Sequence, residues 1–207
     1  MSISLAAPEA VYPDSDGKPM ADNTKQFQWI GILMWELDAL LPGDFVAGDL
    51  LWYPQEGQTV RQAPDVLVAL GRPKGHRGSY RQWEEGNVAP QVVFEVLSPG
   101  NRAGEMQHKL EFYERYGVEE YYLYDPDDFH LSGWIREGAH LRLIDPVDGW
   151  ISPRLGIRFE APGDRELRVF RPDGAMFRPP SEVREALSEA QAELEQLRAR
   201  LREIENK

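Results

Sequence analysis

The sequence predicts a mixed α/β fold, in which helices pack against one mixed β-sheet, followed by a C-terminal coiled-coil helix. Four short segments predict strands, because each is apolar, rich in β-branched or aromatic residues and bounded by Pro or Gly. They span 45–53, 64–70, 92–98 and 118–125. A helical pattern over 102–116 lies between the last two, which indicates a crossover between strands of one sheet. A chain of 207 residues with 42% hydrophobic residues suffices for one packed domain and an appendage.

The first predicted regular element is a helix that ends near Leu41. Apolar residues recur at steps of three and four from Phe27 onward, which is the period of a helix with a buried face. Asp22 or Asn23 can cap its first turn, and Pro42 stops it.

The C-terminal half predicts further short strands. Residues 131–136 and 139–144 flank Glu137-Gly138, a pattern typical of a hairpin. Two more strands are expected over 156–159 and 167–171, and no internal repeat is visible.

Changes of composition divide the chain into three parts. Residues 1–21 carry Pro, Asp and Gly without periodicity, which predicts an irregular N-terminal arm. Residues 22–178 hold the predicted sheet and its helices, and form the predicted domain. Pro179 and Pro180 separate this domain from a tail over 181–207.

The tail carries the seam of a coiled coil, because seven apolar residues alternate spacings of four and three. They are Val183, Leu187, Ala190, Leu194, Leu197, Leu201 and Ile204. In a parallel pair, Glu193 of one copy would face Arg198 of the other, which favours a homodimer through 181–207. The alternative is a single amphipathic helix folded back on the domain, because about three heptads are marginally stable alone.

Charge and composition exclude several functions. With 23 Lys and Arg against 35 Asp and Glu, the net charge of −12 excludes nucleic-acid binding through the overall field, so any basic footprint must be local. The absence of cysteine excludes disulfides, thiolate metal sites and a thiol nucleophile. No apolar run approaches the roughly 18 residues of a membrane span, and the start lacks a signal-peptide pattern. We therefore expect a soluble, cytoplasmic protein with no membrane partner.

One local segment is basic. Residues 66–83 contain no Asp or Glu, and Tyr80 and Trp83 could stack on nucleic-acid bases or line the binding groove. The segment carries Arg72, Lys74, His76, Arg77 and Arg81. Its position between the two strands that carry the acids discussed next would let these cations reach DNA phosphates beside the site. The alternative is a solvated loop whose charges offset the surrounding acids.

Two acidic residues lie on predicted apolar strands. Glu95 interrupts a segment, 92–97, that is apolar on both faces, so its carboxylate requires a cation, a metal or a strong set of hydrogen bonds. Asp65 opens a strand directly after Pro64, where Asp is often only a turn former. Glu95 alone could pair with a nearby Arg, but together the two acids could converge on a hard divalent cation such as Mg²⁺.

The following helix supplies a cation. Glu105, Lys109 and Tyr113 are spaced by four residues and share one stripe of the predicted helix. Because Lys109 borders the apolar face, its long stem could carry the ammonium group along the core to the strand ends. The alternative is an ordinary helical ion pair between Glu105 and Lys109.

Taken in order, these motifs resemble the Uma2 family of restriction endonucleases (domain of unknown function 820), within the PD-(D/E)XK nuclease superfamily. The matching motifs are Pro64-Asp65, the FEVLSP segment 94–99, Glu105 with Lys109 and Tyr113, and the YYLYDP segment 121–126. The resemblance covers about residues 27–170. It implies a restriction-endonuclease-like fold and Mg²⁺- or Mn²⁺-dependent hydrolysis of DNA phosphodiester bonds.

The resemblance also implies roles for single residues. Asp65 and Glu95 match the two acids, which would hold the metal together with the main-chain carbonyl of Val96. The superfamily lysine ordinarily stands two residues after the second acid, where this chain has Leu97. In Uma2 proteins it comes from the next helix, where Lys109 matches.

Two residues of that helix have supporting roles by the same resemblance. Glu105 stands where relatives often carry Asp, and it would complete a second metal position or hold Lys109. Tyr113 would support the site from the same stripe.

Two functional hypotheses follow. The first is a metal-dependent DNA endonuclease, dimerised by its tail, and the intact Asp65, Glu95 and Lys109 favour it. The second is a catalytically inactive DNA-binding or assembly module that retains the fold, favoured by the net charge of −12 and by the absence of a strand lysine. Hydrolysis of a smaller phosphodiester is a third reading.

Overall fold

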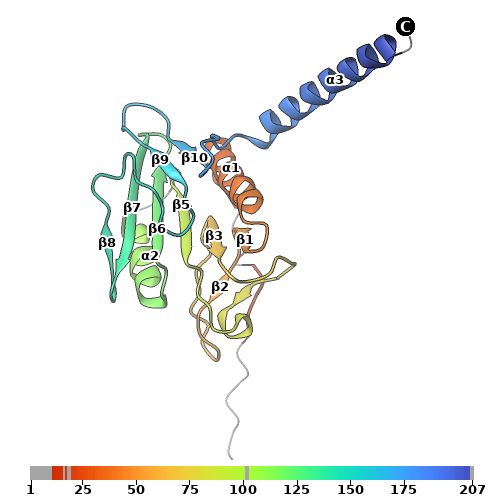
Figure 1. Ribbon diagram of the computed structural model, residues 1–207. Helices are drawn as coiled ribbons and strands as arrows, with labels where there is room; N and C mark the ends of the chain where they lie inside the picture. The colour runs from red at the N-terminus through yellow and green to blue at the C-terminus, as the bar shows by residue number, and fades with distance from the viewer. Residues whose placement is uncertain (1–10, 16, 18–19, 101–102, 206–207) are drawn as a thin grey trace, which may run out of the picture.

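The computed structural model describes residues 11–15, 17, 20–100 and 103–205 (Figure 1). Its centre is a six-stranded sheet of order β1-β3-β5-β6-β7-β8. These strands are β1 (Phe45–Gly48), β3 (Val66–Ala69), β5 (Val92–Val96), β6 (Glu120–Asp125), β7 (His130–Glu137) and β8 (His140–Leu143). Only β5 and β6 pair in parallel within this sheet, as a crossover through α2 requires. The predicted mixed α/β class is confirmed.

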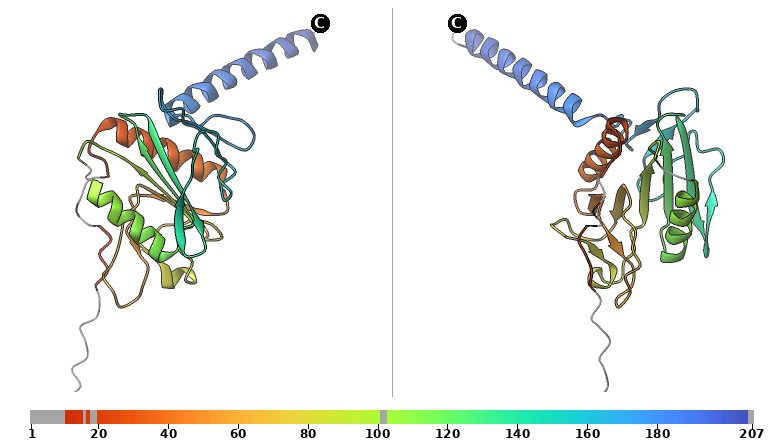
Figure 2. Two further views of the ribbon diagram at one scale, coloured as in Figure 1. Left: turned by 90° about the vertical axis from the view of Figure 1, so that its left-hand side faces the viewer. Right: turned by 180° about the vertical axis from the view of Figure 1, so that it is seen from behind.

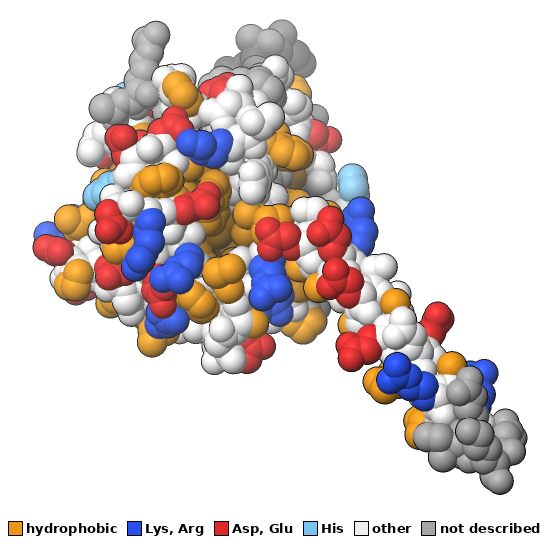
Figure 3. All heavy atoms as spheres, turned by 90° about the horizontal axis from the view of Figure 1, so that it is seen from above, with side chains coloured by type: hydrophobic (Ala, Val, Ile, Leu, Met, Phe, Trp, Pro, Cys, Tyr) orange, Lys and Arg blue, Asp and Glu red, His pale blue; other side chains and the backbone are white. Residues whose placement is uncertain are grey.

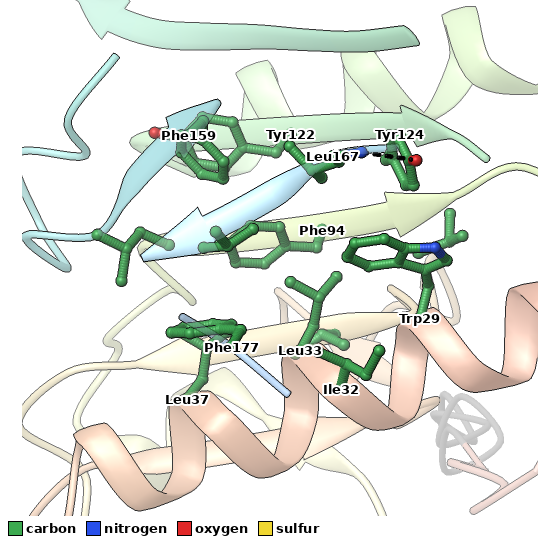
Figure 4. Packing of buried hydrophobic residues seen from close by; sticks show 14 of the residues in the cluster. Trp29, Ile32, Leu33, Leu37, Phe94, Tyr122, Tyr124, Phe159, Leu167 and Phe177 are labelled. Carbon is green, nitrogen blue, oxygen red and sulfur yellow. Dashed lines mark hydrogen bonds between the residues drawn. The ribbon is translucent and has the colours of Figure 1, made fainter. Parts of the chain in front are cut away.

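Two helices cover opposite faces of the sheet (Figure 2). α1 (Thr24–Leu40) begins at Asn23, whose side chain accepts a hydrogen bond from the main-chain N–H of Gln26. Its buried side chains, among them Trp29 and Leu33, pack on Phe94 and Tyr122 of the sheet (Figure 4). This apolar layer fixes the start of α1 beside the end of β5.

α2 (Ala103–Tyr116) covers the other face. Tyr113 packs there with Leu67, Val93 and Tyr121 in a second apolar cluster. Because side chains alternate along a strand, β5 directs Val93 and Glu95 toward α2 and its even-numbered residues toward α1. The predicted start of this helix at Arg102 lies outside the described residues.

The predicted strand over 45–53 is wrong in one respect, because it is two strands. β1 ends at Gly48, and Asp49 has a φ of 50°, which turns the chain before β2 (Trp52–Tyr53). β2 pairs in parallel with β4 (Tyr80–Arg81), which the sequence did not predict and which leads into the 3₁₀ helix η1 (Gln82–Glu85).

A small antiparallel pair, β9 (Arg158–Glu160) and β10 (Arg168–Phe170), packs over the α1 side of the sheet. The loop before β9 is attached to β6 by the carboxylate of Glu120, which is almost fully buried. This carboxylate accepts hydrogen bonds from the Tyr122 hydroxyl (2.8 Å), the Ser152 hydroxyl and the main-chain N–H of Arg154 (2.7 Å).

The C-terminal helix α3 (Pro180–Glu205) starts beside α1 and projects away from the rest of the protein (Figures 1 and 3). It is therefore not folded back on the sheet. The arm expected over 1–21 has neither helix nor strand at residues 11–15, 17, 20 and 21, and its other residues lie outside the described chain. Among the described helices, none combines the length and the apolar character needed to cross a membrane.

Candidate active site

The two predicted acids meet near the ends of two neighbouring interior strands, β3 and β5. β3 and β5 pair antiparallel with Val66 opposite Phe94, and this register, continued by one residue, places Asp65 opposite Glu95. The Asp65 carboxylate accepts a hydrogen bond of 2.7 Å from the main-chain N–H of Val96. Neighbouring antiparallel strands thus bring together two acids that are 30 residues apart in sequence.

Glu95 is held by two residues of α2. Its side chain is 2% exposed, one oxygen accepts a hydrogen bond of 2.7 Å from the Lys109 ammonium, and the other accepts one from the Tyr113 hydroxyl. The buried carboxylate is therefore compensated by a lysine and not by an arginine. Glu105 is exposed, and no hydrogen bond or ion pair within the described chain joins it to Lys109.

The electrostatics of the site keep Lys109 charged and disfavour the ionised form of Asp65. Burial raises the pKa of Asp65 well above its usual value, and the neighbouring Glu95 raises it further. Burial alone would lower the pKa of Lys109, but the carboxylates of Glu95 and Asp65 raise it above that of a free lysine. Burial, followed by Glu95, raises the pKa of Tyr113, so its hydroxyl remains a hydrogen-bond donor.

These groups suit a divalent cation. Two carboxylates face one ammonium, and the second oxygen of Asp65 accepts no hydrogen bond from the described residues. Carboxylate and carbonyl oxygens are ligands for hard ions, and Mg²⁺ typically takes few of them and keeps several waters. An ion that needs few protein ligands fits this site, because the described residues contain no group of three or more His, Asp or Glu side chains that could hold a metal.

Gln26 is a site residue that the sequence did not indicate. Its buried side-chain amide donates a hydrogen bond of 2.8 Å to the carbonyl of Val96, the predicted main-chain metal ligand. Its own oxygen accepts one of 2.8 Å from the main-chain N–H of Asp22. The sequence signal for Gln26 was its position four residues before Ile30 and seven before Leu33, which places a polar residue on the buried face of the helix. Phe27, which we expected on that face, is exposed.

The basic segment is largely neutralised by carboxylates that lie outside it. Glu85 binds Arg77 at 2.5 Å and lies 3.7 Å from Arg72. Lys74 pairs with Asp38 on α1. These contacts match the alternative of a loop whose charges offset nearby acids.

Two predicted DNA contacts in the same segment differ in exposure. Tyr80 is fully buried, with its hydroxyl hydrogen-bonded to the carbonyl of Val88 at 2.8 Å. The prediction that Tyr80 stacks on bases is therefore wrong. Arg81 is partly exposed and pairs at 3.3 Å with Glu84, an exposed residue.

The mixed sheet thus joins an acidic pair on neighbouring strands to a lysine on the next helix. A family model, Uma2, described as "Putative restriction endonuclease", matches residues 18–198. The chain belongs to the Uma2 family, as its motifs predicted.

Comparison with curated proteins and with solved structures adds little to the family match. No curated protein matches the chain. The chain is similar to a crystal structure of a putative nuclease belonging to DUF820 from Anabaena variabilis. The identity is 16% over 71% of this chain and 84% of that chain, with a TM-score of 0.49.

Proposed function

We propose that the protein is a Mg²⁺- or Mn²⁺-dependent endonuclease that hydrolyses DNA phosphodiester bonds with Asp65, Glu95 and Lys109. The observation that carries the proposal is the acidic pair formed by Asp65, directly before β3, and the buried Glu95 on β5, compensated by a single ammonium group. In this proposal residues 22–178 are the nuclease domain, preceded by an arm and followed by the tail.

Each residue has a separate role in this reaction. Asp65, Glu95 and the carbonyl of Val96 would hold the ion, and a bound divalent ion supplies Lewis-acid chemistry that makes water more acidic and offsets phosphate charge. Lys109, which Glu95 and Asp65 keep protonated, presents a fixed positive charge to the negative charge that develops on the phosphate. Tyr113 restrains Glu95 through its hydroxyl.

Cleavage of plasmid DNA tests the proposal. We expect purified protein to convert supercoiled plasmid to nicked or linear DNA with Mg²⁺ or Mn²⁺, and to leave it intact with EDTA. Glu95→Gln protein, purified in the same way, is the control for contaminating nucleases. Hydrolysis of a small phosphodiester such as bis(p-nitrophenyl) phosphate without DNA cleavage would contradict the assignment of DNA as substrate.

In this proposal, Lys74 and Arg81 contact the phosphates of the DNA. Both have partly exposed side chains, and their pairs with Asp38 and Glu84 are surface ion pairs, which are typically worth about 1 kcal/mol or less. A phosphate can replace such a partner. Arg72 and Arg77, held together by Glu85, would shape the loop that presents them.

The tail is proposed to form a homodimer through residues 181–207. Its described seam leaves five large apolar side chains about half exposed, at 47–59% (Figure 3). They are Val183, Leu187, Leu194, Leu197 and Leu201. An unpartnered apolar stripe of this size on a lone helix is unfavourable in water, and a second copy would bury it. The same stripe supports the alternative of an assembly module without catalysis.

Disruption of the seam tests the dimer. We expect Leu194→Glu with Leu201→Glu to halve the mass measured by light scattering, because two buried charges would oppose pairing at neighbouring heptads. Glu189→Gln, an exposed change elsewhere on α3, should leave the mass unchanged. A monomeric wild-type protein, or a double variant with wild-type mass, would exclude the coiled coil.

A further inference from the structure

The arm segment, defined here as residues 11–15, places a tyrosine on an aromatic surface of the domain. The Tyr12 ring lies 5.0 Å from that of Trp83 and 5.2 Å from that of Tyr53. The Arg81 guanidinium lies 5.4 Å from the centre of the Tyr12 ring. The Tyr12 hydroxyl accepts a hydrogen bond of 2.5 Å from the main-chain N–H of Gly57.

A carboxylate follows two residues later. The Asp14 carboxylate lies so close to Gly78 that a side chain at that glycine would overlap it, and Ser79 donates a hydrogen bond to it at 3.4 Å. The Tyr53 hydroxyl, which is near Arg61 and Arg81 as well, donates a hydrogen bond of 2.7 Å to the carbonyl of Pro13. An aromatic ring and an anion thus lie side by side on a surface with two arginines.

This arrangement has the chemistry of a bound nucleotide. The Tyr12 ring packs against Trp83 at an interplanar angle of 51°, beside Arg81, and so covers a ring on which a base could stack, while the Asp14 carboxylate places an anion next to it. Aromatic platforms with nearby arginines bind single-stranded nucleic acid by stacking and charge. The arm segment has neither helix nor strand, so its local release breaks no hydrogen bonds of regular secondary structure.

The surface is also within reach of the acidic pair. The main-chain N–H of Asp49 donates a hydrogen bond of 3.3 Å to the carbonyl of Asp65. Tyr53 follows four residues later, at most about 14 Å away along an extended chain.

We propose that Gly78, Arg81 and Trp83 form a subsite for single-stranded DNA, and that the arm segment occupies it as an internal competitor. The inference rests on the proposed nuclease function, because it assumes a DNA substrate. The arm is regulatory in this proposal, because a strand must displace Tyr12 and Asp14 before it binds near the acids.

Binding of a labelled oligothymidylate of about ten nucleotides, within the usual site size of such surfaces, tests the inference. Fluorescence anisotropy is measured on the full chain with EDTA, so that cleavage does not intervene. We expect Tyr12→Ala with Asp14→Ala to bind about tenfold more tightly than wild type, because stacking competition by the arm is lost. Adding Trp83→Ala should remove the gain.

Val11→Ala is the matched control, because Val11 belongs to the arm segment and its side chain is exposed. Its affinity should equal that of the wild type. Equal affinities of the wild type and the double variant, with both folded by circular dichroism, would overturn the inference. So would a gain that survives Trp83→Ala.

The outcomes separate this inference from the proposed function. Tighter oligonucleotide binding by the double variant without plasmid cleavage in Mg²⁺ would refute the nuclease and leave the subsite in place. Plasmid cleavage with no difference in oligonucleotide affinity would refute the subsite alone.

Discussion

Asp65→Asn is expected to abolish metal-dependent DNA cleavage and at the same time to raise the melting temperature of the metal-free protein. The amide oxygen of asparagine can still accept the hydrogen bond from Val96, so the local geometry is kept. What is lost is the negative charge that would hold the ion. Because a catalytic ion is worth several kcal/mol, we expect cleavage to fall by at least about 10²-fold.

The gain in stability follows from the pKa of Asp65. Burial and Glu95 raise that pKa in the folded protein above the unfolded value of about 3.9. The ionised carboxylate therefore opposes folding, and the wild type loses stability as the pH rises from the unfolded pKa through the folded one. Asparagine mimics the neutral form, so the difference in melting temperature should be present at pH 7 and vanish in acid.

Plasmid cleavage and thermal unfolding at pH 7 and pH 4 measure the two effects. Asp164→Asn, at an exposed position in the loop between β9 and β10, should change neither. Mg²⁺ should raise the melting temperature of the wild type and not that of Asp65→Asn. Cleavage that persists in Asp65→Asn would exclude this residue from the active site.

Glu120→Ala is expected to lower the melting temperature by about 10 °C. The substitution leaves the Tyr122 hydroxyl, the Ser152 hydroxyl and the Arg154 N–H without their buried acceptor. Each such loss costs about 1–3 kcal/mol, and in a chain of this size about 1 kcal/mol shifts the melting temperature by 2–4 °C.

Two other substitutions calibrate this result. Glu120→Gln keeps one acceptor oxygen, so its loss of stability should be smaller. Glu119→Ala removes only a partly exposed ion pair with Arg154 and should change the melting temperature by about 2–4 °C at most. Differential scanning calorimetry measures all three, and a Glu120→Ala protein as stable as Glu119→Ala would contradict the anchoring role.

The sequence predicted the main strands of the sheet, and the need of Glu95 for a partner, because both depend on local patterns. β5 is recognised from its apolar run, and a charge within that run requires a partner. The Lys109 ammonium contacts Glu95, which agrees with one of the two alternatives drawn from its place on the border of an apolar helix face.

The features that the sequence did not predict depend on contacts between distant segments. β4 has two residues and forms because β2 pairs with it. The turn at Asp49, which separates β2 from β1, has no strong sequence signal. Glu85 and Asp38, which neutralise cations of the basic segment, lie outside residues 66–83. A count of charged residues within that segment therefore overestimates its positive charge. Tyr80 is buried for the same reason, because β2 and the neighbouring core close over it.

The alternation of side chains along β5 separates the chemistry of this protein from its scaffold. One surface of the strand is wholly apolar and supports α1, while the other carries Glu95 among aromatic rings. In the proposed function Glu95 and Lys109 serve the chemistry, so a lineage that lost nuclease activity could replace them by apolar residues without disturbing the first layer. Inactive descendants should be recognisable by paired hydrophobic substitutions at those two positions, with the α1 side unchanged.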